Sequence, residues 1–238
     1  MVVGVRGFMK VSALIPVKSF TQAKQRLTPL LGEGEREVLA EAMLRDVLGR
    51  VVLARGLEAI YVVTADERVS TIAESLGARV LREKGECGET EAVQFALCEL
   101  KQMGVAVVLV IPADIPLVRT SDIEDLIAPA WRDHSGAPFV VLVPSHDRLG
   151  TNALLLSPPD VIGLRFGYDS FSYHLRQAAG RGIPFQVMEN ARIGLDIDEP
   201  SDLARFLSAG EAGGESYARV AQMGLLEPSP NAWKPGNS

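Results

Sequence analysis

Short apolar runs alternate along the chain with stretches in which apolar residues recur every three or four positions. Unbroken apolar runs are typical of strands that are buried on both faces of a parallel sheet. The clearest run is 105–111, where every residue is apolar and most are β-branched. The same pattern predicts further strands at 11–17, 59–64, 78–81, 139–144, 151–156, 185–189 and 192–197.

Helical periodicity is clearest over 33–55, where Leu39, Met43 and Val47 belong to one apolar stripe. Strands that alternate with such helices predict an α/β fold, a three-layer sandwich around a mostly parallel, partly mixed central sheet. Further helices are predicted at 67–76, 89–103, 121–128, 170–181 and 199–208.

The 238 residues are 47% hydrophobic, which suffices for one large domain with its own core. We expect that domain over residues 1–208, with residues 1–8 as a ragged start. From Ala209 the composition changes to Gly, Ser, Pro and Asn. This change predicts a tail over 209–238 that is extended or disordered.

A net charge of -6 argues against nucleic acid as a partner, because phosphate backbones require clustered Lys and Arg. Two cysteines, Cys87 and Cys98, are too few for a disulfide scaffold, so a reducing cytoplasm is the expected location. Apolar runs stay shorter than the roughly 18 residues of a spanning helix, and no membrane partner is predicted.

A carboxylate that could bind a ligand follows directly on the central apolar run, in Pro112-Ala113-Asp114-Ile115-Pro116. Ligands of open α/β sheets bind outside the carboxyl ends of the strands, where Asp114 is expected. Asp114 either holds a metal ion or caps the next helix. Because Ser121 and Asp122 are better spaced for the cap, we favour the metal.

Asp196 and Asp198 form a second acidic signal, in Asp196-Ile197-Asp198 near a predicted strand end. On a strand, residues two apart point to the same side, so the two carboxylates would share a cation. Hard oxygen ligands of this kind suit magnesium with a bound phosphate. The alternative is a pair of exposed acids before a helix.

Three cations follow the first predicted strand, at Lys18, Lys24 and Arg26. Loops in this position bind phosphates in α/β folds, so these side chains could neutralise a triphosphate. The alternative is an ordinary solvated loop. Neither GxxxxGK[ST] nor GxGxxG occurs, which gives no support to a P-loop or a standard dinucleotide site.

The segment 165–170 precedes a predicted helix, so Asp169 or Ser170 is by default its N-cap, although a helix start also binds anions. Thr151 adds a hydroxyl near a strand edge. His174, one turn into the helix, is interpreted as a structural hydrogen-bonder, and His134 and His146 show no metal spacing.

Several segments of the chain are informative in combination. They are IPVKSFTQAKQRL (15–27), AMLRDVL (42–48), PADIPL (112–117), DRLGTNALLL (147–156), RFGYDSFSYH (165–174) and GLDIDEPSDL (194–203). Together these segments resemble one family, the CofC/FbiD guanylyltransferases of the MobA-like nucleotidyltransferase group. The resemblance implies a Rossmann-like nucleotidyltransferase fold and a GTP-dependent step in coenzyme F-420 biosynthesis. In that step a phosphorylated three-carbon acid attacks the α-phosphorus of GTP and pyrophosphate leaves.

The resemblance also implies roles for individual residues. Magnesium would be held by Asp114, Asp196 and Asp198. The phospho-acid would contact Thr151, Gly167 and Ser170, and the nucleoside would lie near Thr64 and Asp66. The triphosphate would face Lys18, Lys24 and Arg26, and the catalytic residues would be these three cations and Asp114.

The sequence departs from the family at Thr90-Glu91, where relatives often carry Leu-Asn. The acceptor stays open among phospholactate, phosphoenolpyruvate and 3-phosphoglycerate, and so does a homodimer. Two other functions are compatible with the same residues. One is a nucleotide-sugar-dependent glycosyltransferase, and the other is a non-catalytic nucleotide-binding module whose acids cap helices.

Overall fold

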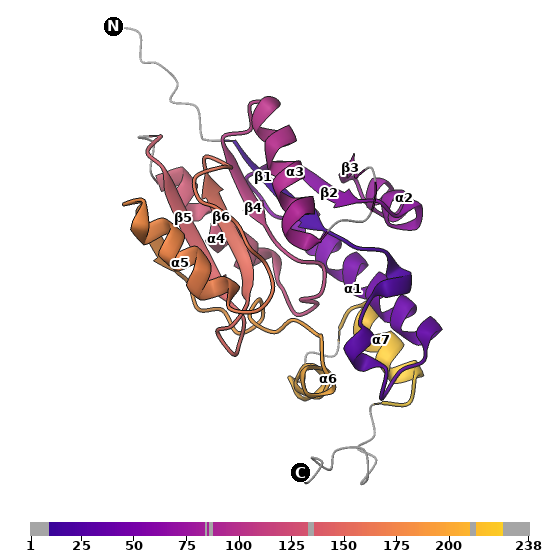
Figure 1. Ribbon diagram of the computed structural model, residues 1–238. Coiled ribbons are helices and arrows are strands. Elements are labelled where there is room, and N and C mark those ends of the chain that lie inside the picture. The colour runs from indigo at the N-terminus through magenta and orange to yellow at the C-terminus, as the bar shows by residue number, and fades with distance from the viewer. Residues whose placement is uncertain (1–9, 84, 86–87, 133–135, 210–212, 226–238) are drawn as a thin grey trace, which may run out of the picture.

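The computed structural model describes residues 10–83, 85, 88–132, 136–209 and 213–225 (Figure 1). Residues 1–8, Cys87, His134 and 226–238, on which expectations were stated above, lie outside the described residues. The strands are β1 (Val11–Pro16), β2 (Leu57–Thr64), β3 (Arg79–Arg82), β4 (Val107–Val110), β5 (Phe139–Pro144), β6 (Thr151–Ser157) and β7 (Phe185–Val187).

The seven strands form one sheet in the order β3-β2-β1-β4-β6-β5-β7. β6 runs antiparallel to both β4 and β5, and the other pairs are parallel. The chain builds outward from β1 to β3 and then returns to the other side of β1 as β4. The space beyond the carboxyl ends of β1 and β4 is therefore where such a sheet binds ligands.

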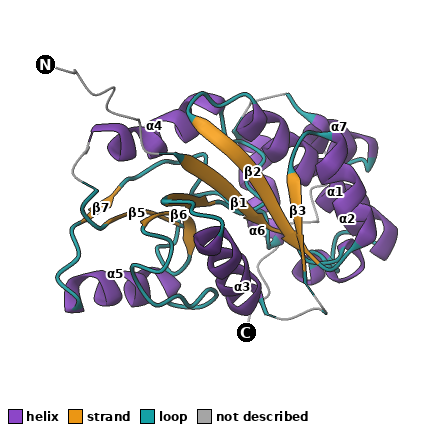
Figure 2. Cartoon of the chain, turned by 90° about the horizontal axis from the view of Figure 1, so that it is seen from above, coloured by secondary structure: helices purple, strands orange, loops and turns teal. Residues whose placement is uncertain are grey.

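Helices cover both faces of the sheet, which confirms the predicted three-layer α/β sandwich. Figure 2 shows α3 and α5 below the sheet and α4 above it, and α1 and α2 share the core on the side of α4. The helices are α1 (Glu33–Val52), α2 (Glu67–Ser75), α3 (Glu89–Gln102), α4 (Thr120–Arg132), α5 (Ser170–Gly180), α6 (Pro200–Ser208) and α7 (Glu215–Gln222). Within the described residues, none of these helices combines the length and apolar character needed to span a bilayer.

The position of the central strand β4, buried on both faces, explains why its sequence lacks polar residues. Val107 and Leu109 belong to the core under α1, α2 and α4, whereas Val108 and Val110 belong to the core under α3 and α5. All four side chains are buried. A strand enclosed on both faces must be apolar at every position, as the run 105–111 predicted.

The strand predicted at 192–197 is wrong, because residues 191–194 form a turn. The side-chain oxygen of Asn190 accepts the backbone N–H groups of Arg192 and Ile193, and its carbonyl accepts that of Gly194 at 2.8 Å. These bonds take the donors that a sheet ladder would need. Asp196 and Asp198 therefore lie on a loop and not on a strand.

The tail prediction is wrong for 215–222, which form α7 against α1. Asp46 of α1 accepts the backbone N–H groups of Glu215 at 2.7 Å and Ser216 at 2.8 Å. Val220 is fully buried in a cluster with α6 and α1. The cap of α7 comes from another helix, so the local composition could not indicate it.

Candidate active site

The site lies beyond the carboxyl ends of β1 and β4. Asp114 follows β4, and its backbone oxygen accepts the N–H of Ile197 at 3.0 Å. This bond brings the loop after β4 against the loop that contains Asp196 and Asp198. The helix after Asp114 is capped by Asp122, which accepts the N–H of Arg119 at 2.9 Å. Asp114 is thus free of the capping role and faces the site.

Lys24 joins two of the predicted acids. Its Nζ lies 2.7 Å from Asp114 Oδ2 and 2.8 Å from Asp198 Oδ1, and its side chain is only 8% exposed. Burial lowers the pKa of Lys24, but the charges and hydrogen bonds of the two acids outweigh it and raise the pKa. Burial raises the pKa of Asp198, whereas Lys24 lowers it and prevails. Lys24 is therefore firmly charged and bridges the acids.

Asp196 is held in a less favourable environment for its charge. Burial and the nearby Asp114 raise its pKa to about 6, although a hydrogen bond from Asn152 opposes the shift. Asn152 Nδ2 donates to Asp196 Oδ1 and to the Ile193 carbonyl, both at 2.9 Å. Asn152 is a site residue that the sequence reasoning missed, and a buried amide on the apolar strand β6 was its only signal.

The acids fit a hard divalent cation in their donor chemistry. Asp114 Oδ1 is buried without a hydrogen-bond partner, and such an orphaned carboxylate oxygen is suited to a cation. Burial, and then the charge of Asp114, raise the pKa of Asp196, so its ionised form would be stabilised by a nearby cation. As the side chains stand, no three Asp, Glu, His or Cys residues in the described part of the chain form a metal cluster. The donors thus fit in kind, while Lys24 bridges two of them.

Two cavities meet at these acids. The first, of about 400 Å³, extends along the loop after β1, and the second, of about 450 Å³, lies between β6, α5 and α6. Asp196 lines only the second cavity. The residues that line both are Arg26, Glu89, Pro112, Asp114 and Asp198. A ligand in either cavity therefore reaches the same pair of carboxylates.

The first cavity combines cations with an apolar wall. It is lined by Lys18, Lys24 and Arg26, whose binding of phosphate remains a prediction, and Phe20 and Met43 add apolar surface. Arg26 also approaches Glu199, with Nη1 3.5 Å from Oε1. The wall suits a flat apolar group and the cations suit phosphates.

Glu89, the first residue of α3, lines both cavities and was also missed from the sequence. Burial and the charge of Asp114 raise its pKa to about 7. Lys18 opposes this shift. Glu89 therefore titrates near neutral pH at the junction of the two cavities.

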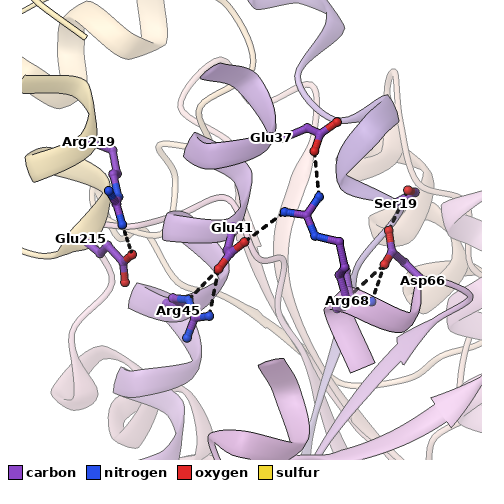
Figure 3. Close-up of polar contacts among 9 residues, drawn as sticks. Ser19, Glu37, Glu41, Arg45, Asp66, Arg68, Glu215 and Arg219 are labelled. Carbon is purple, nitrogen blue, oxygen red and sulfur yellow. Dashed lines mark hydrogen bonds and ion pairs between the residues drawn. The ribbon is translucent and has the colours of Figure 1, made fainter. Parts of the chain in front are cut away.

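Thr64 and Asp66 lie beside the first cavity, but Ala65 between them is the residue that lines it. Asp66 caps α2 through the N–H groups of Arg68 at 2.7 Å and Val69 at 3.3 Å, and it accepts the Ser19 hydroxyl at 2.7 Å (Figure 3). The hydroxyl of Thr64, a fully buried residue, accepts the N–H of Asp66 at 3.0 Å. Both side chains thus shape the loop, and a nucleoside contact for them remains a prediction.

The second cavity contains the three residues expected at the phospho-acid. Thr151, Gly167 and Ser170 all line it. Gly167 has φ 94°, a left-handed conformation that favours glycine. Asp169 is the N-cap residue of α5, but its side chain makes no cap bond.

Thr90, where the sequence departs from the expected family pattern, has a structural task at this cavity. Its Oγ1 accepts the N–H of Phe166 at 2.9 Å. The bond ties the start of α3 to the loop 165–169, which forms one wall of the second cavity. The departure thus places a polar anchor behind that loop.

Comparisons with known proteins agree on one family. Residues 11–226 match the family described as "Guanylyl transferase CofC like". A phosphoenolpyruvate guanylyltransferase of Conexibacter woesei is 34% identical over 93% of this chain and 99% of its own length. A 2-phospho-L-lactate guanylyltransferase of Methanothermobacter thermautotrophicus is 39% identical over 85% of this chain and 86% of its own. A 3-phospho-D-glycerate guanylyltransferase of Colwellia psychrerythraea is 36% identical over 82% and 90%.

Solved structures agree on the fold. A candidate nucleotide-diphospho-sugar transferase from Desulfovibrio desulfuricans G20 superposes with a TM-score of 0.74 and 16% identity. The match covers 91% of this chain and 96% of the other. At this identity the likeness shows the architecture alone, and it is the architecture described above.

Proposed function

Because the chain belongs to the family of CofC-like guanylyl transferases, we propose that it joins GTP to a phosphorylated three-carbon acid and releases pyrophosphate. The acceptor is phosphoenolpyruvate, 2-phospholactate or 3-phosphoglycerate, the substrates in the names of its relatives. The product would serve coenzyme F-420 biosynthesis in the cytoplasm. The observation that supports this assignment is the pair of cavities that share Asp114 and Asp198.

Each substrate has a cavity suited to its chemistry. GTP would occupy the first cavity, with the triphosphate against Lys18, Lys24 and Arg26. The phospho-acid would occupy the second, against Thr151 and Ser170. The α-phosphorus would then lie at the junction, within reach of an acceptor oxygen. Positioning of this kind supplies much of the rate in a group transfer.

Asp114, Asp196 and Asp198 are the residues that would hold a divalent cation, which we propose is magnesium. When bound, this ion would neutralise phosphate charge and polarise the phosphoryl oxygens. The orphaned Asp114 Oδ1 and the crowded Asp196 support this proposal.

The chemistry needs no protein nucleophile. An anionic oxygen of the acceptor phosphate forms a bond to the α-phosphorus, and the bond from that phosphorus to the β-bridging oxygen breaks. The electron pair leaves with pyrophosphate. The attacking oxygen is already ionised at neutral pH, so no general base is required. The cations of the first cavity stabilise the charge that develops on the leaving group.

A substrate matrix tests the assignment. Each of the four nucleoside triphosphates is combined with each of the three phospho-acids, with magnesium or with EDTA. Pyrophosphate release and product mass are measured. We expect product only with GTP, one phospho-acid and the metal together. Sugar transfer from a nucleotide-sugar, or ligand binding without any product, would contradict the proposal.

Asp114→Asn tests the shared acid within the same assay. The substitution removes the charge at the junction, and we expect turnover to fall by at least about 100-fold. The matched control is Asp125→Asn, an exposed acid on α4, which should behave as the wild type. Unchanged turnover in Asp114→Asn would exclude the metal assignment for this residue.

A further inference from the structure

His174 is a buried titratable side chain that the proposed chemistry does not use. It lies on α5, is fully buried, and packs against the rings of Phe166 and Tyr173. Its two ring nitrogens both have polar partners. Nδ1 lies 3.0 Å from Thr151 Oγ1, and Nε2 lies 3.2 Å from the backbone nitrogen of Arg165.

The Arg165 contact determines where the imidazole proton resides. A backbone N–H can only donate, so Nε2 must accept and must be unprotonated. Burial, and to a lesser extent the charge of Arg165, lower the pKa of His174 to about 4. The ring is neutral at physiological pH and has one proton. That proton is therefore on Nδ1, which donates to Thr151 Oγ1.

The Thr151 hydroxyl has one proton and two lone pairs. One lone pair accepts Nδ1–H of His174, and the other faces the Ser170 hydroxyl, which donates at 3.4 Å. The proton of Thr151 is thus left to donate elsewhere. Thr151 lines the second cavity, so that proton is available to a ligand there.

We propose that His174 is a positioning residue for the acceptor. It orients the Thr151 hydroxyl as an obligate donor into the second cavity, where an anionic oxygen of the phospho-acid accepts it. His174 itself touches neither the substrate nor the reacting atoms. The inference rests on the proposed function for the identity of the ligand, whereas the proton arrangement stands on the geometry alone.

Two substitutions separate the two contacts of the imidazole. An Asn side chain can place an amide donor near Nδ1, so His174→Asn keeps the bond to Thr151. A Gln side chain can place its carbonyl near Nε2, so His174→Gln keeps the bond to Arg165 N–H. His174→Phe keeps the ring and loses both. Tyr173→Phe, in the neighbouring ring, is the matched control for packing.

Steady-state kinetics gives the first test. We expect His174→Gln and His174→Phe to raise the KM of the phospho-acid about 10- to 100-fold, because a hydrogen bond to a charged group is lost. The KM of GTP should change less than about twofold in these variants. In His174→Asn, which keeps a donor to Thr151, the KM of the phospho-acid should recover most of the way to the wild-type value. Rescue by Gln in place of Asn would overturn the proposal, since it would show that His174 only anchors the loop.

A double-mutant cycle tests whether the effect passes through Thr151. In a Thr151→Val background, His174→Phe should raise the KM of the phospho-acid by less than about twofold, because the hydroxyl that His174 orients is absent. Thr151→Ser should retain the dependence on His174. If His174→Phe raised this KM as much in the Thr151→Val background as in the wild type, the result would contradict the proposal.

Nitrogen-15 spectroscopy tests the proton arrangement without any turnover. The chain has three histidines, so selective labelling gives a simple spectrum, and His174→Asn assigns the signal. We expect a neutral ring protonated at Nδ1 at pH 7, which shifts when phospho-acid is added. An Nε2-protonated or charged ring would overturn the inference. A wild type with the expected ring and no guanylyl transfer would contradict only the proposed function.

Discussion

His174 also links the stability of the fold to pH. Its pKa is lowered from 6.5 to about 4 by burial and by Arg165. Between these values the unfolded chain binds a proton that the folded chain does not. This contribution to stability is therefore present above about pH 6.5 and is lost as the pH falls toward 4.

We predict that His174→Asn flattens this dependence. From pH 7.5 to pH 4.5 the wild type should lose about 2–3 kcal/mol more unfolding free energy than the variant, since one pKa unit corresponds to about 1.36 kcal/mol. Urea unfolding at both pH values measures the difference, and other titrating groups cancel in it. Parallel curves for the two proteins would contradict a buried neutral ring.

Single residues differed in how far the sequence could predict them. Asp114 was predictable because a strand end in an α/β sheet has a known relation to ligands. Asn152 and Glu89 were not, because their roles depend on partners distant in sequence: Asn152 on Asp196, and Glu89 on Asp114. His174 was correctly interpreted as a hydrogen-bonder, but its two partners come from β6 and the loop before α5.

At the scale of elements, α7 depends on α1. Asp46 accepts two backbone N–H groups at the start of α7. We predict that Asp46→Ala costs about 1–2 kcal/mol of unfolding free energy, the usual cost of removing an N-cap. Hydrogen exchange should show faster exchange in 215–222. The residues of α7 line neither cavity, so the KM values should not change.

Arg219→Ala is the control for this element. It removes an exposed ion pair with Glu215 within the same helix (Figure 3), with an Nη2 to Oε1 distance of 3.1 Å. Such pairs contribute less than about 1 kcal/mol. A cost equal to that of Asp46→Ala would mean that the general loss of helix contacts, and not the cap, destabilises α7.

Elements were predictable from the sequence where burial alone sets their pattern, as in β4 and α1. The segment 192–197 was not, because Ile193, Leu195 and Ile197 occupy every second position, as in a strand, although the segment is a loop. Ile193 packs in the core under α1, α2 and α4, and Leu195 and Ile197 pack in the cluster with α1, α6 and α7, without joining the ladder of the sheet. An Asn190 turn and the pair between Arg192 and the buried Asp122 hold the loop. Apolar alternation reports burial, which a strand and a well-packed loop share.

At the scale of the whole molecule, the proposed placement of one substrate in each cavity predicts that the two substrates interact. Each substrate is an anion, and both cavities end at Asp114 and Asp198. Without a divalent cation at the junction, the negative charges of the two ligands repel one another, and the single charge of Lys24 is already shared by Asp114 and Asp198. With a divalent cation at the junction, the positive charge would attract both ligands, so binding of one ligand would favour binding of the other. The sign of the coupling between the substrates should therefore depend on the metal.

We predict this change of sign in ligand-induced stabilisation. A GTP analogue with a methylene group between the α- and β-phosphorus cannot transfer its guanylyl group, so binding can be measured alone. At 100 times its dissociation constant, each ligand should add about 2.7 kcal/mol to the unfolding free energy. In magnesium the stabilisation by both ligands together should exceed the sum of their separate stabilisations, whereas in EDTA it should be smaller than that sum.

The control is Asp125→Asn, which should give the wild-type result in both conditions, whereas Asp114→Asn should abolish the difference between magnesium and EDTA. Additive stabilisation in both conditions would mean that the substrates do not meet at the shared acids, because coupling between sites is reciprocal and must appear in either ligand.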